Sequence, residues 1–320
     1  MDKEIVLLTG YAGFIGSQLL RDLISSGYYV VGLDNFSEGS NPENIRGLEG
    51  EGTLFTLLKM DMGDCSLEDT LMDLGLAYKL KYIINCGAQS HVDRSFSQVR
   101  KFVESNIIGP LNLAKMALNE KWKVEKFIQV STDEVFAHSP QPFHENSPYS
   151  PQNAYATSKH SAEVFLQNYH KAFGLPLVIT NGANTYGPRQ NEEKIIPLTI
   201  KRIIERKKIP LYKTPARRMW MHVEDHSSGI IAAMENGIIG EKYCLAPNDV
   251  NEKYTSELIE DICELMGVNF EDFVEYVEDR PNYDLRYYMV NDKAVNELGW
   301  VPQKDINNCL KDVISTYTSW

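Results

Sequence analysis

Two adjacent carboxylates follow a hydroxyl at the end of an apolar run, in the segment QVSTDEVF (residues 129–136). The run KFIQV before them is typical of a buried strand, which places Thr132, Asp133 and Glu134 at its tip. Burying two neighbouring acids is costly unless they are paired, solvated or used. Taken alone, the pair fits a solvated loop tip about as well as an acid–base pair in which one carboxyl keeps its proton.

A tyrosine and a lysine lie one helical turn apart in the segment YATSK. Tyr155 and Lys159 are at positions i and i+4 of a predicted helix, so they share a face. A neighbouring ammonium favours the phenolate, which could take a hydroxyl proton while hydride leaves the same carbon. Such pairs are also common on solvated helix surfaces. This one gains weight because its helix follows the strand that carries Thr132.

Three glycines mark the first strand-to-helix turn, in TGYAGFIG. Gly10 permits a tight turn, Gly13 lets backbone approach a pyrophosphate, and Gly16 lets the helix pack close to the sheet. The spacing GxxGxxG is weak evidence alone, but its position between a strand and a helix strengthens it. Asp34 ends the second strand, where an acid binds both ribose hydroxyls and repels a 2′-phosphate, which favours NAD over NADP. Asp61 could reach the adenine or cap a loop.

NADP stays a weaker alternative at the sequence level. Ser37, Ser40 and Arg46 could bind a phosphate if their loop folds back.

Strand-length apolar runs alternate with helix-length amphipathic segments over the first part of the chain. This alternation predicts a Rossmann-type, doubly wound parallel sheet with helices on both faces. The predicted strands are 4–10, 28–34, 53–61, 82–88, 126–131 and 175–182, and the predicted helices are 14–27, 94–119 and 152–174. The later chain predicts a smaller α+β part over a cleft at the carboxyl edge of the sheet, with helices 194–208 and 255–267 and short strands 208–212 and 242–246.

The composition excludes several classes of protein. The 320 residues are 43% hydrophobic and carry a formal net charge of −12, which argues against a nucleic-acid or anionic-membrane partner. Five scattered cysteines without a CxxC pair favour neither disulfides nor a metal site, and they fit a reducing compartment. We therefore expect a cytoplasmic protein without a signal peptide or membrane span.

The motifs together resemble the extended short-chain dehydrogenase/reductases of the nucleotide-sugar branch, and more closely the dTDP-glucose 4,6-dehydratases. Besides TGYAGFIG, GLDN and YATSK, the resemblance rests on SHVDRS (90–95), ESNIIGP (104–110), STDEVF (131–136), NTYGPRQNEEKIIPL (184–198), VEDH (223–226), DRPNYDLRY (279–287) and LGWVPQ (298–303). It covers nearly the whole chain. The Asp–Glu pair is its specific element, since epimerases and reductases of this branch lack the two acids after the Thr.

The resemblance implies a reaction and a role for each candidate catalytic residue. Tyr155, supported by Lys159, would take the proton of the sugar's 4-hydroxyl, which Thr132 orients, while hydride goes to NAD. Glu134 would remove the proton on carbon 5, and a protonated Asp133 would donate to the departing 6-hydroxyl. Hydride would then return to carbon 6, so that NAD never has to leave.

The resemblance also implies binding residues and a domain division. Residues 1–184, with segments near 222–246, would form the NAD-binding domain, and residues 185–320 would mainly bind the nucleotide sugar. The cofactor site would comprise Gly10, Gly13, Phe14, Ile15, Gly16, Asp34, Asn35, Asp61, Met62, Ala88, Ser90, Ser105, Tyr155 and Lys159, beside Gly87 and Gln89. Substrate contacts would be His91, Thr132, Asn184, Lys194, Ile195, Tyr212, Arg218, Asn251, Asp279 and Arg280. In the family, the helices near 94–119 and 153–173 form a homodimer through a four-helix bundle.

The chain departs from the family pattern near the expected substrate. Gln89 replaces an acid, Thr185 an Asn and Met219 an Asp, while Asn282 and Tyr283 are bulkier than the family's residues. The nucleotide sugar therefore stays open between dTDP-glucose, UDP-glucose and UDP-N-acetylglucosamine. So does inversion at carbon 5. Two other functions stay as alternatives: a 4-epimerase or 4-keto reductase of the same fold, and a non-catalytic NAD-binding protein.

Overall fold

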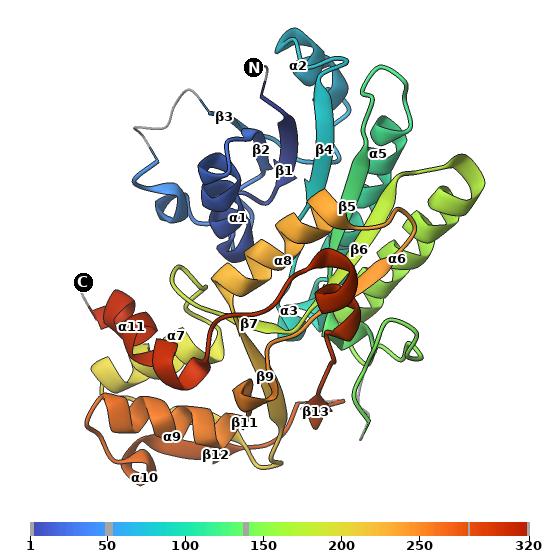
Figure 1. Ribbon diagram of the computed structural model, residues 1–320. Helices are drawn as coiled ribbons and strands as arrows, with labels where there is room; N and C mark the ends of the chain where they lie inside the picture. Colours follow the sequence, from blue (N-terminus) through green and yellow to red (C-terminus); the bar gives the residue numbers. More distant parts are fainter. Residues whose placement is uncertain (1–2, 49–53, 137–140, 281, 319–320) are drawn as a thin grey trace.

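A single parallel sheet forms the centre of the molecule. The computed structural model describes residues 3–48, 54–136, 141–280 and 282–318. Within these residues seven parallel strands lie in the order β3-β2-β1-β4-β5-β6-β10 (Figure 1). They are β1 (Ile5–Thr9), β2 (Tyr29–Asp34), β3 (Phe55–Lys59), β4 (Leu80–Asn85), β5 (Lys126–Thr132), β6 (Leu177–Gly182) and β10 (Lys242–Leu245). The predicted doubly wound sheet is confirmed, and its order reverses between β1 and β4, where such folds bind ligands.

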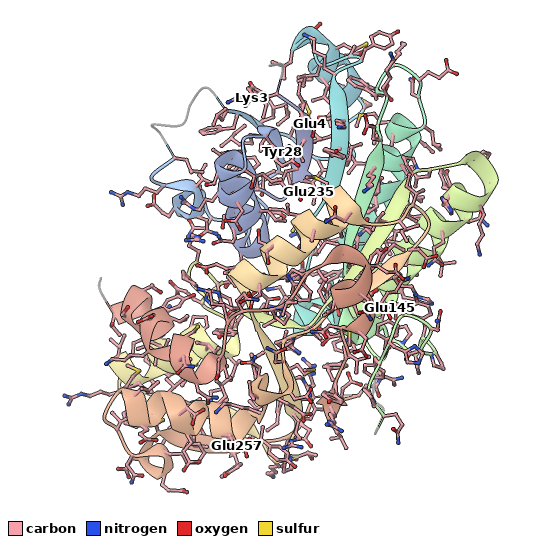
Figure 2. The ribbon with its side chains drawn as sticks, viewed as in Figure 1. Lys3, Glu4, Tyr28, Glu145, Glu235 and Glu257 are labelled. Carbon is pink, nitrogen blue, oxygen red and sulfur yellow. The ribbon has the colours of Figure 1, made fainter. Side chains whose placement is uncertain are left out.

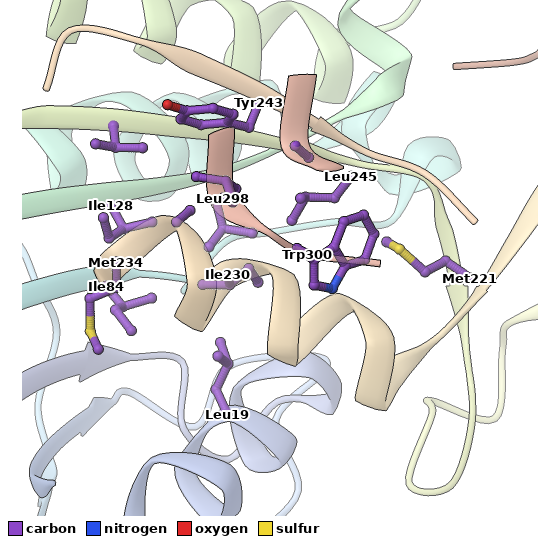
Figure 3. Packing of buried hydrophobic residues seen from close by; sticks show 14 of the residues in the cluster. Leu19, Ile84, Ile128, Met221, Ile230, Met234, Tyr243, Leu245, Leu298 and Trp300 are labelled. Atoms are coloured by element: carbon purple, nitrogen blue, oxygen red, sulfur yellow. The ribbon is translucent and has the colours of Figure 1, made fainter. Parts of the chain in front are cut away.

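Helices cover both faces of the sheet because the strand side chains alternate between two apolar faces. Val6 and Leu8 pack with α1 and α8 on one face, whereas Leu7 packs with α2, α5 and α6 on the other. Figure 3 shows part of the first face, where Leu19 of α1 and Ile230 of α8 lie against the strands. These helices are α1 (Phe14–Ser25), α2 (Leu67–Asp73), α5 (Gly109–Ala117), α6 (Ala154–Phe173) and α8 (Val223–Asn236).

Residues 223–245 return to the central sheet after the intervening chain has left it. β10 pairs with β6 in parallel, and α8 packs beside α1. The hydroxyl of Tyr28 donates to Glu235 Oε1 at 2.8 Å, which joins the start of β2 to the end of α8 (Figure 2). The domain boundary at residue 184 stays a prediction.

The segment predicted as one helix over 94–119 is interrupted, and that prediction is wrong in this respect. It consists of α3 (Val92–Ser97), α4 (Val99–Val103), the π-helical turn η3 (Glu104–Ile108) and α5. Pro110 has no N–H for an α-helical bond to the carbonyl of Asn106, and the wider π-helical turn accommodates it. The turn leaves the Asn106 side chain bonded to both the N–H and the carbonyl of Gln89, at 2.8 and 2.9 Å. It thereby fixes the chain that follows β4.

The remaining elements form a smaller α+β part, as expected from the mixed pattern. β9 pairs with β7, β11 and β13, and β8 pairs with β12. Isoleucine and leucine side chains of α7, α9 and α11 fill a separate core against these strands. The strands are β7 (Asn184–Tyr186), β8 (Ile209–Tyr212), β9 (Arg217–His222), β11 (Glu252–Tyr254), β12 (Val274–Val277) and β13 (Arg286–Tyr287). The helices are α7 (Ile195–Ile204), α9 (Thr255–Leu265), α10 (Phe270–Phe273) and α11 (Ile306–Thr318), with shorter turns η1 (Pro42–Ile45), η4 (Asp133–Val135), η5 (Asp249–Asn251) and η6 (Ala294–Leu298).

The close packing of the first turn gives a test of the fold. A methyl group at Gly16 would lie 1.9 Å from the carbonyl oxygen of Gly10, so Gly16→Ala should lower the free energy of unfolding by about 3 kcal/mol. Gly27, just after the same helix, has φ +90 but nothing within 4 Å, so Gly27→Ala should cost about 1–2 kcal/mol. Urea unfolding followed by circular dichroism measures both. Equal costs would show that the β1–α1 turn can shift.

Candidate active site

A cavity of about 320 Å³ lies where the loops after six parallel strands converge. It is lined from the β1–α1 turn at one end to the start of α7 at the other. All fourteen residues predicted to bind the cofactor line it: Gly10, Gly13, Phe14, Ile15, Gly16, Asp34, Asn35, Asp61, Met62, Ala88, Ser90, Ser105, Tyr155 and Lys159. The cavity therefore brings together the set that sequence patterns proposed from widely separated segments.

The β1–α1 turn forms a cradle suited to an anion. Gly10 has φ +73, and a Cβ there would lie 2.7 Å from Gly87 Cα, so the two loops touch through backbone. Gly13 caps α1 without a side-chain hydrogen bond, and the first turn of α1 carries no acid. The first amides of a 12-residue helix are thus open toward the cavity, an arrangement that fits a pyrophosphate.

Asp34 is buried at the end of β2, 5% exposed, and its position is fixed by backbone donors. Its Oδ2 accepts from Ala12 N at 3.0 Å and its Oδ1 from Phe36 N at 2.8 Å. Asn35 donates to Asp61 at 2.6 Å beside it. Arg46, named above as a possible phosphate ligand, is not among the cavity residues and faces Glu43 at 3.4 Å. Ser37 and Ser40, the other two residues named as possible phosphate ligands, do line the cavity. The Asp34 carboxylate and the position of Arg46 outside the cavity lining favour a free ribose over a 2′-phosphate.

Thr132, Asp133 and Glu134 stand together at the end of β5, where the chain enters η4. Thr132 caps this turn, since its hydroxyl accepts from Glu134 N at 3.3 Å and donates to Asp133 Oδ1 at 3.1 Å. Asp133 is 2% exposed, and burial, followed by the charge of Glu134, raises its pKa to about 7. Glu134 is half-buried and accepts from Asn153 Nδ2 at 3.0 Å. Two adjacent acids therefore have different surroundings, which suits one to donate and the other to accept a proton.

Tyr155 and Lys159 reach the same cavity from α6. Lys159 Nζ donates to the Val130 carbonyl at 2.7 Å, and burial lowers the pKa of Lys159 to about 8. Burial, and then the charge of Glu134, raises the pKa of Tyr155 well above its ordinary value, while a hydrogen bond with Thr132 opposes this. The expectation that Lys159 lowers the pKa of Tyr155 is therefore wrong in this structure, because the effect of burial is larger.

Five of the residues predicted to contact the substrate line the cavity, and five do not. His91, Thr132, Asn184, Lys194 and Ile195 line it. The five outside its lining are Tyr212, Arg218, Asn251, Asp279 and Arg280.

Asn251 and Asp279 are committed to bonds within the protein. The side chain of Asn251 is fully buried, donates to Lys304 O at 3.2 Å and accepts from Ile306 N at 2.7 Å. Asp279 accepts from the backbone and hydroxyl of Thr214. These bonds give no support to the predicted substrate contacts of Asn251 and Asp279.

Tyr212, Arg218 and Arg280 gather around one aromatic ring, that of Tyr283. The ring of Tyr212 lies 4.7 Å from it, and the guanidinium groups of Arg218 and Arg280 lie 5.7 and 5.5 Å from its centroid. The pKa of Asp133 is raised overall, and the charge of Arg218 partly opposes this. Arg218 therefore lies close enough to act on the carboxylate pair. We call these four residues the arginine–tyrosine cluster.

The other departures from the family pattern have structural partners. Gln89 Nε2 donates to Ser37 Oγ at 2.8 Å and so ties the loop after β2 to the loop after β4. Thr185 donates to Ala183 O at 3.0 Å and lies 2.8 Å from His226 Nδ1. Met219 is buried, and its sulfur accepts from Met289 N at 3.4 Å. Asn282 donates to Gln152 O at 3.0 Å.

Several residues that hold the candidate catalytic groups in place were not predicted from the sequence. Asn153 caps α6 by accepting from Ala156 N at 2.8 Å and also holds Glu134. Its signal was an Asn directly before a predicted helix. Glu163 and Asn181 lie buried behind β5 and are bonded to each other at 2.8 Å. The i+4 spacing from Lys159 could have indicated Glu163, whereas nothing in the sequence pointed to Asn181.

Comparison with known proteins agrees with this geometry. A family model described as GDP-mannose 4,6 dehydratase matches residues 7–313. A dTDP-glucose 4,6-dehydratase from Haemophilus influenzae is 33% identical, over 98% of this chain and 97% of its own. A crystal structure of a dTDP-glucose 4,6-dehydratase from Streptomyces venezuelae with NAD bound has a TM-score of 0.91 at 31% identity, covering 98% of this chain and 97% of that one. A UDP-glucose 4-epimerase from Thermotoga maritima has a TM-score of 0.88 at 24% identity, covering 98% and 99%, which shows a shared fold alone.

The raised pKa of Asp133 predicts a pH-dependent cost to stability. Because the folded-state pKa lies above the ordinary aspartate value of 3.8, stability falls as pH rises from about 4 to about 7, where Asp133 must ionise. Asp133→Asn should therefore raise the free energy of unfolding at pH 8 by on the order of 2 kcal/mol, with no gain near pH 4. Urea unfolding at several pH values measures this difference. The same substitution at the exposed Asp312 is the control, and a gain at Asp133 that does not vary with pH would contradict the prediction.

Proposed function

The chain belongs to the GDP-mannose 4,6 dehydratase family and is an NAD-dependent nucleotide-sugar 4,6-dehydratase, and we propose which of its residues carry out the reaction and on which substrates. One observation carries the proposal. A buried acid with a raised pKa, Asp133, adjoins a half-buried carboxylate, Glu134, in the cavity that also holds Tyr155 and Lys159. Elimination of water needs such a donor and such an acceptor on neighbouring carbons.

The cradle at the first turn and Asp34 are the residues that would hold the cofactor. The open amides of α1 suit the pyrophosphate, Asp34 suits the ribose hydroxyls, and Lys159 lies at the far end of the same cavity. Bound there, NAD would accept a hydride from carbon 4 and return it to carbon 6. The net redox change is then zero.

The residues of the chain would move the protons. Tyr155 takes the proton of the 4-hydroxyl, which Thr132 holds by a hydrogen bond. Burial and Glu134 oppose the phenolate, so Tyr155 needs a cation nearby, and Lys159 supplies one from the same helix face.

The resulting 4-ketone makes the proton on carbon 5 acidic, and the two acids then act on opposite ends of one bond. Glu134 takes the proton from carbon 5, and Asp133 gives its own proton to the 6-hydroxyl, which leaves as water. Glu134 returns a proton to carbon 5 after hydride reaches carbon 6. Tyr155 ends with one proton more and Asp133 with one fewer, and exchange through the open cavity restores both.

The substrate class is a nucleoside diphosphate hexose with a free 4-hydroxyl and 6-hydroxyl. The arginine–tyrosine cluster would take the diphosphate, because guanidinium groups bind phosphates in bidentate fashion. dTDP-glucose, UDP-glucose and UDP-N-acetylglucosamine are the candidate substrates, since Asn282 and Tyr283 alter the cluster relative to the family pattern.

Mass spectrometry tests the reaction directly. Purified protein is incubated separately with dTDP-glucose, UDP-glucose and UDP-N-acetylglucosamine, without added NAD. Loss of one water from one of them is expected, because the cofactor is regenerated in each cycle and should co-purify. No water loss from any of them, even with NAD added, would overturn the dehydratase and bring the 4-epimerase or reductase alternative forward.

Substitution of the two acids separates the steps. Asp133→Asn and Glu134→Gln should each slow water loss by about 10²–10³-fold but still allow oxidation at carbon 4, because neither group touches the 4-hydroxyl proton. The absorbance of the reduced nicotinamide should then rise on mixing with substrate. Tyr155→Phe is the matched variant, and it should abolish that rise as well. Full water loss in Asp133→Asn would contradict the assigned role.

We further propose that the protein is a homodimer through α3, α4, η3 and α6. Six apolar side chains on these adjacent elements are exposed: Phe96, Val99, Val103, Ile108, Val164 and Phe165. Exposed apolar patches of this kind mark protein–protein contact sites. A second copy of the chain would bury the same patch on both partners, as a twofold interface requires.

Light scattering on a sizing column tests the dimer. Phe165→Asp should give a monomer at micromolar concentration, because it places a charge in the apolar contact. Ile204→Asp, at an exposed apolar position of α7, is the control and should stay dimeric. A wild-type monomer would contradict the proposal.

We also propose a cytoplasmic location. All five cysteines are free thiols, which fits a reducing compartment. Within the described residues no helix is both long and apolar enough to cross a membrane.

A further inference from the structure

Glu163 is a fully buried carboxylate that the reaction steps above do not use. It lies on α6, four residues after Lys159, with no exposed surface. Its two oxygens accept from Ser131 Oγ, from Asn181 Nδ2 at 2.8 Å and from the hydroxyl of Tyr149 at 2.8 Å. Three donors and no acceptor around a carboxyl group are the surroundings of an ionised carboxylate. Since burying such a charge is costly, its position calls for an explanation.

The hydrogen bonds of Glu163 fix the end of β5. Ser131 directly precedes Thr132, and Asn181 on the neighbouring β6 donates not only to Glu163 but also to the Thr132 carbonyl, at 3.0 Å. The carboxylate thus joins two strands at the residue that begins the catalytic segment. A shift here would move Thr132 and both acids that follow it.

Glu163 also acts on the charge of Lys159. Burial lowers the pKa of Lys159, and two groups oppose this, Cys86 and Glu163. Burial raises the pKa of Cys86 to about 12, so its thiol is neutral near neutral pH. Of these two groups, Glu163 is therefore the one that can supply negative charge.

The other titratable groups that face Glu163 come from α6, from the loop before it and from β10. Tyr149 lies in the loop before α6, His160 on α6, and Lys242 and Cys244 on β10. Lys242 donates to the hydroxyl of Tyr149, so it faces Glu163 through that group. Burial raises the pKa of Tyr149 and Cys244 and lowers that of His160, which leaves all three neutral near neutral pH.

We propose that Glu163 is a positioning residue for the reaction, a buried carboxylate that holds the end of β5 in register and keeps the Lys159 ammonium charged. It touches neither substrate nor cofactor, since it does not line the cavity. The inference rests on the proposed function, because Thr132 and Lys159 are the groups through which it acts.

Three variants separate its two effects. Glu163→Gln removes the charge, so Lys159 should lose its proton at lower pH: the alkaline limb of the kcat profile should move down by about one unit. Its kcat should fall about tenfold or more, with KM within about twofold. Glu163→Asp keeps the charge, so its alkaline limb should stay in place while kcat falls. Asn181→Leu also keeps the charge but frees the Thr132 carbonyl, so it should lower kcat without moving the limb.

Two results would overturn the proposal. One is a wild-type kcat and alkaline limb in folded Glu163→Gln, and the other is an equal shift of the limb in Glu163→Asp. If Glu163→Gln does not fold, Asn181→Leu decides, and a wild-type kcat there overturns the positioning role.

A readout without cofactor or substrate keeps this inference distinct from the proposed function. Because the folded-state pKa of Lys159 lies below the ordinary lysine value of 10.5, stability should rise as pH increases from about 8, and Glu163→Gln should start that rise at lower pH. Urea unfolding of cofactor-free protein measures this. Failure of the proposed function would instead appear in the wild-type protein, as an absence of water loss from all three sugars.

Discussion

The change of backbone at the end of β5 is the constraint on which the active site depends. A strand turns successive side chains to opposite faces, whereas a 3₁₀ turn spaces them by about 120°. The change occurs at Thr132, where pairing with Gly182 of β6 ends and η4 begins. Both acids line the cavity, but Asp133 is consequently buried while Glu134 is only half-buried. The burial that raises the pKa of Asp133 follows from this single change.

Hydrogen bonds from several elements around β5 hold that arrangement in place. Asn153 holds Glu134 and at the same time begins α6, so the helix that carries Tyr155 and Lys159 starts in register with the acids. Behind the strand, Glu163 and Asn181 bind the segment that leads into the turn. Asn153, Glu163 and Asn181 thus bond the candidate catalytic segments to other parts of the sheet layer. Such fixed positions are the condition for a preorganised site.

Local patterns were enough to predict the sheet and the residues on its carboxyl edge. Gly10, Asp34 and Thr132 each follow a predicted strand, and parallel strands bring their carboxyl ends to one edge, so their meeting in one cavity could be predicted. Tyr155 and Lys159 could be placed on one face by their spacing. These inferences succeed because they need only the period of an element and the direction of a parallel sheet.

Other features depended on contacts that no local pattern reveals. Glu163 meets Ser131 across 32 residues and Asn181 across 18, and only the packed fold shows that its charge has partners. The raised pKa of Tyr155 likewise follows from burial rather than from its spacing to Lys159. The π-helical turn before Pro110 had a visible signal, but its consequence, the anchoring of Gln89 by Asn106, did not.

The residues proposed for proton transfer and those proposed for substrate binding come from different parts of the fold. This explains where the chain departs from its relatives. The groups proposed to transfer protons lie on η4, directly after β5, and on α6, inside the layer built on the central sheet. The arginine–tyrosine cluster comes instead from β8, β9 and the segment before β13, which are not strands of the central sheet. Replacement of Tyr283 therefore changes contacts with Tyr212, Arg218 and Arg280, none of which lies on a strand of that sheet. With the roles proposed above, a change of nucleotide or sugar preference would arise in that cluster, while the residues at the end of β5 would keep their geometry and their reaction.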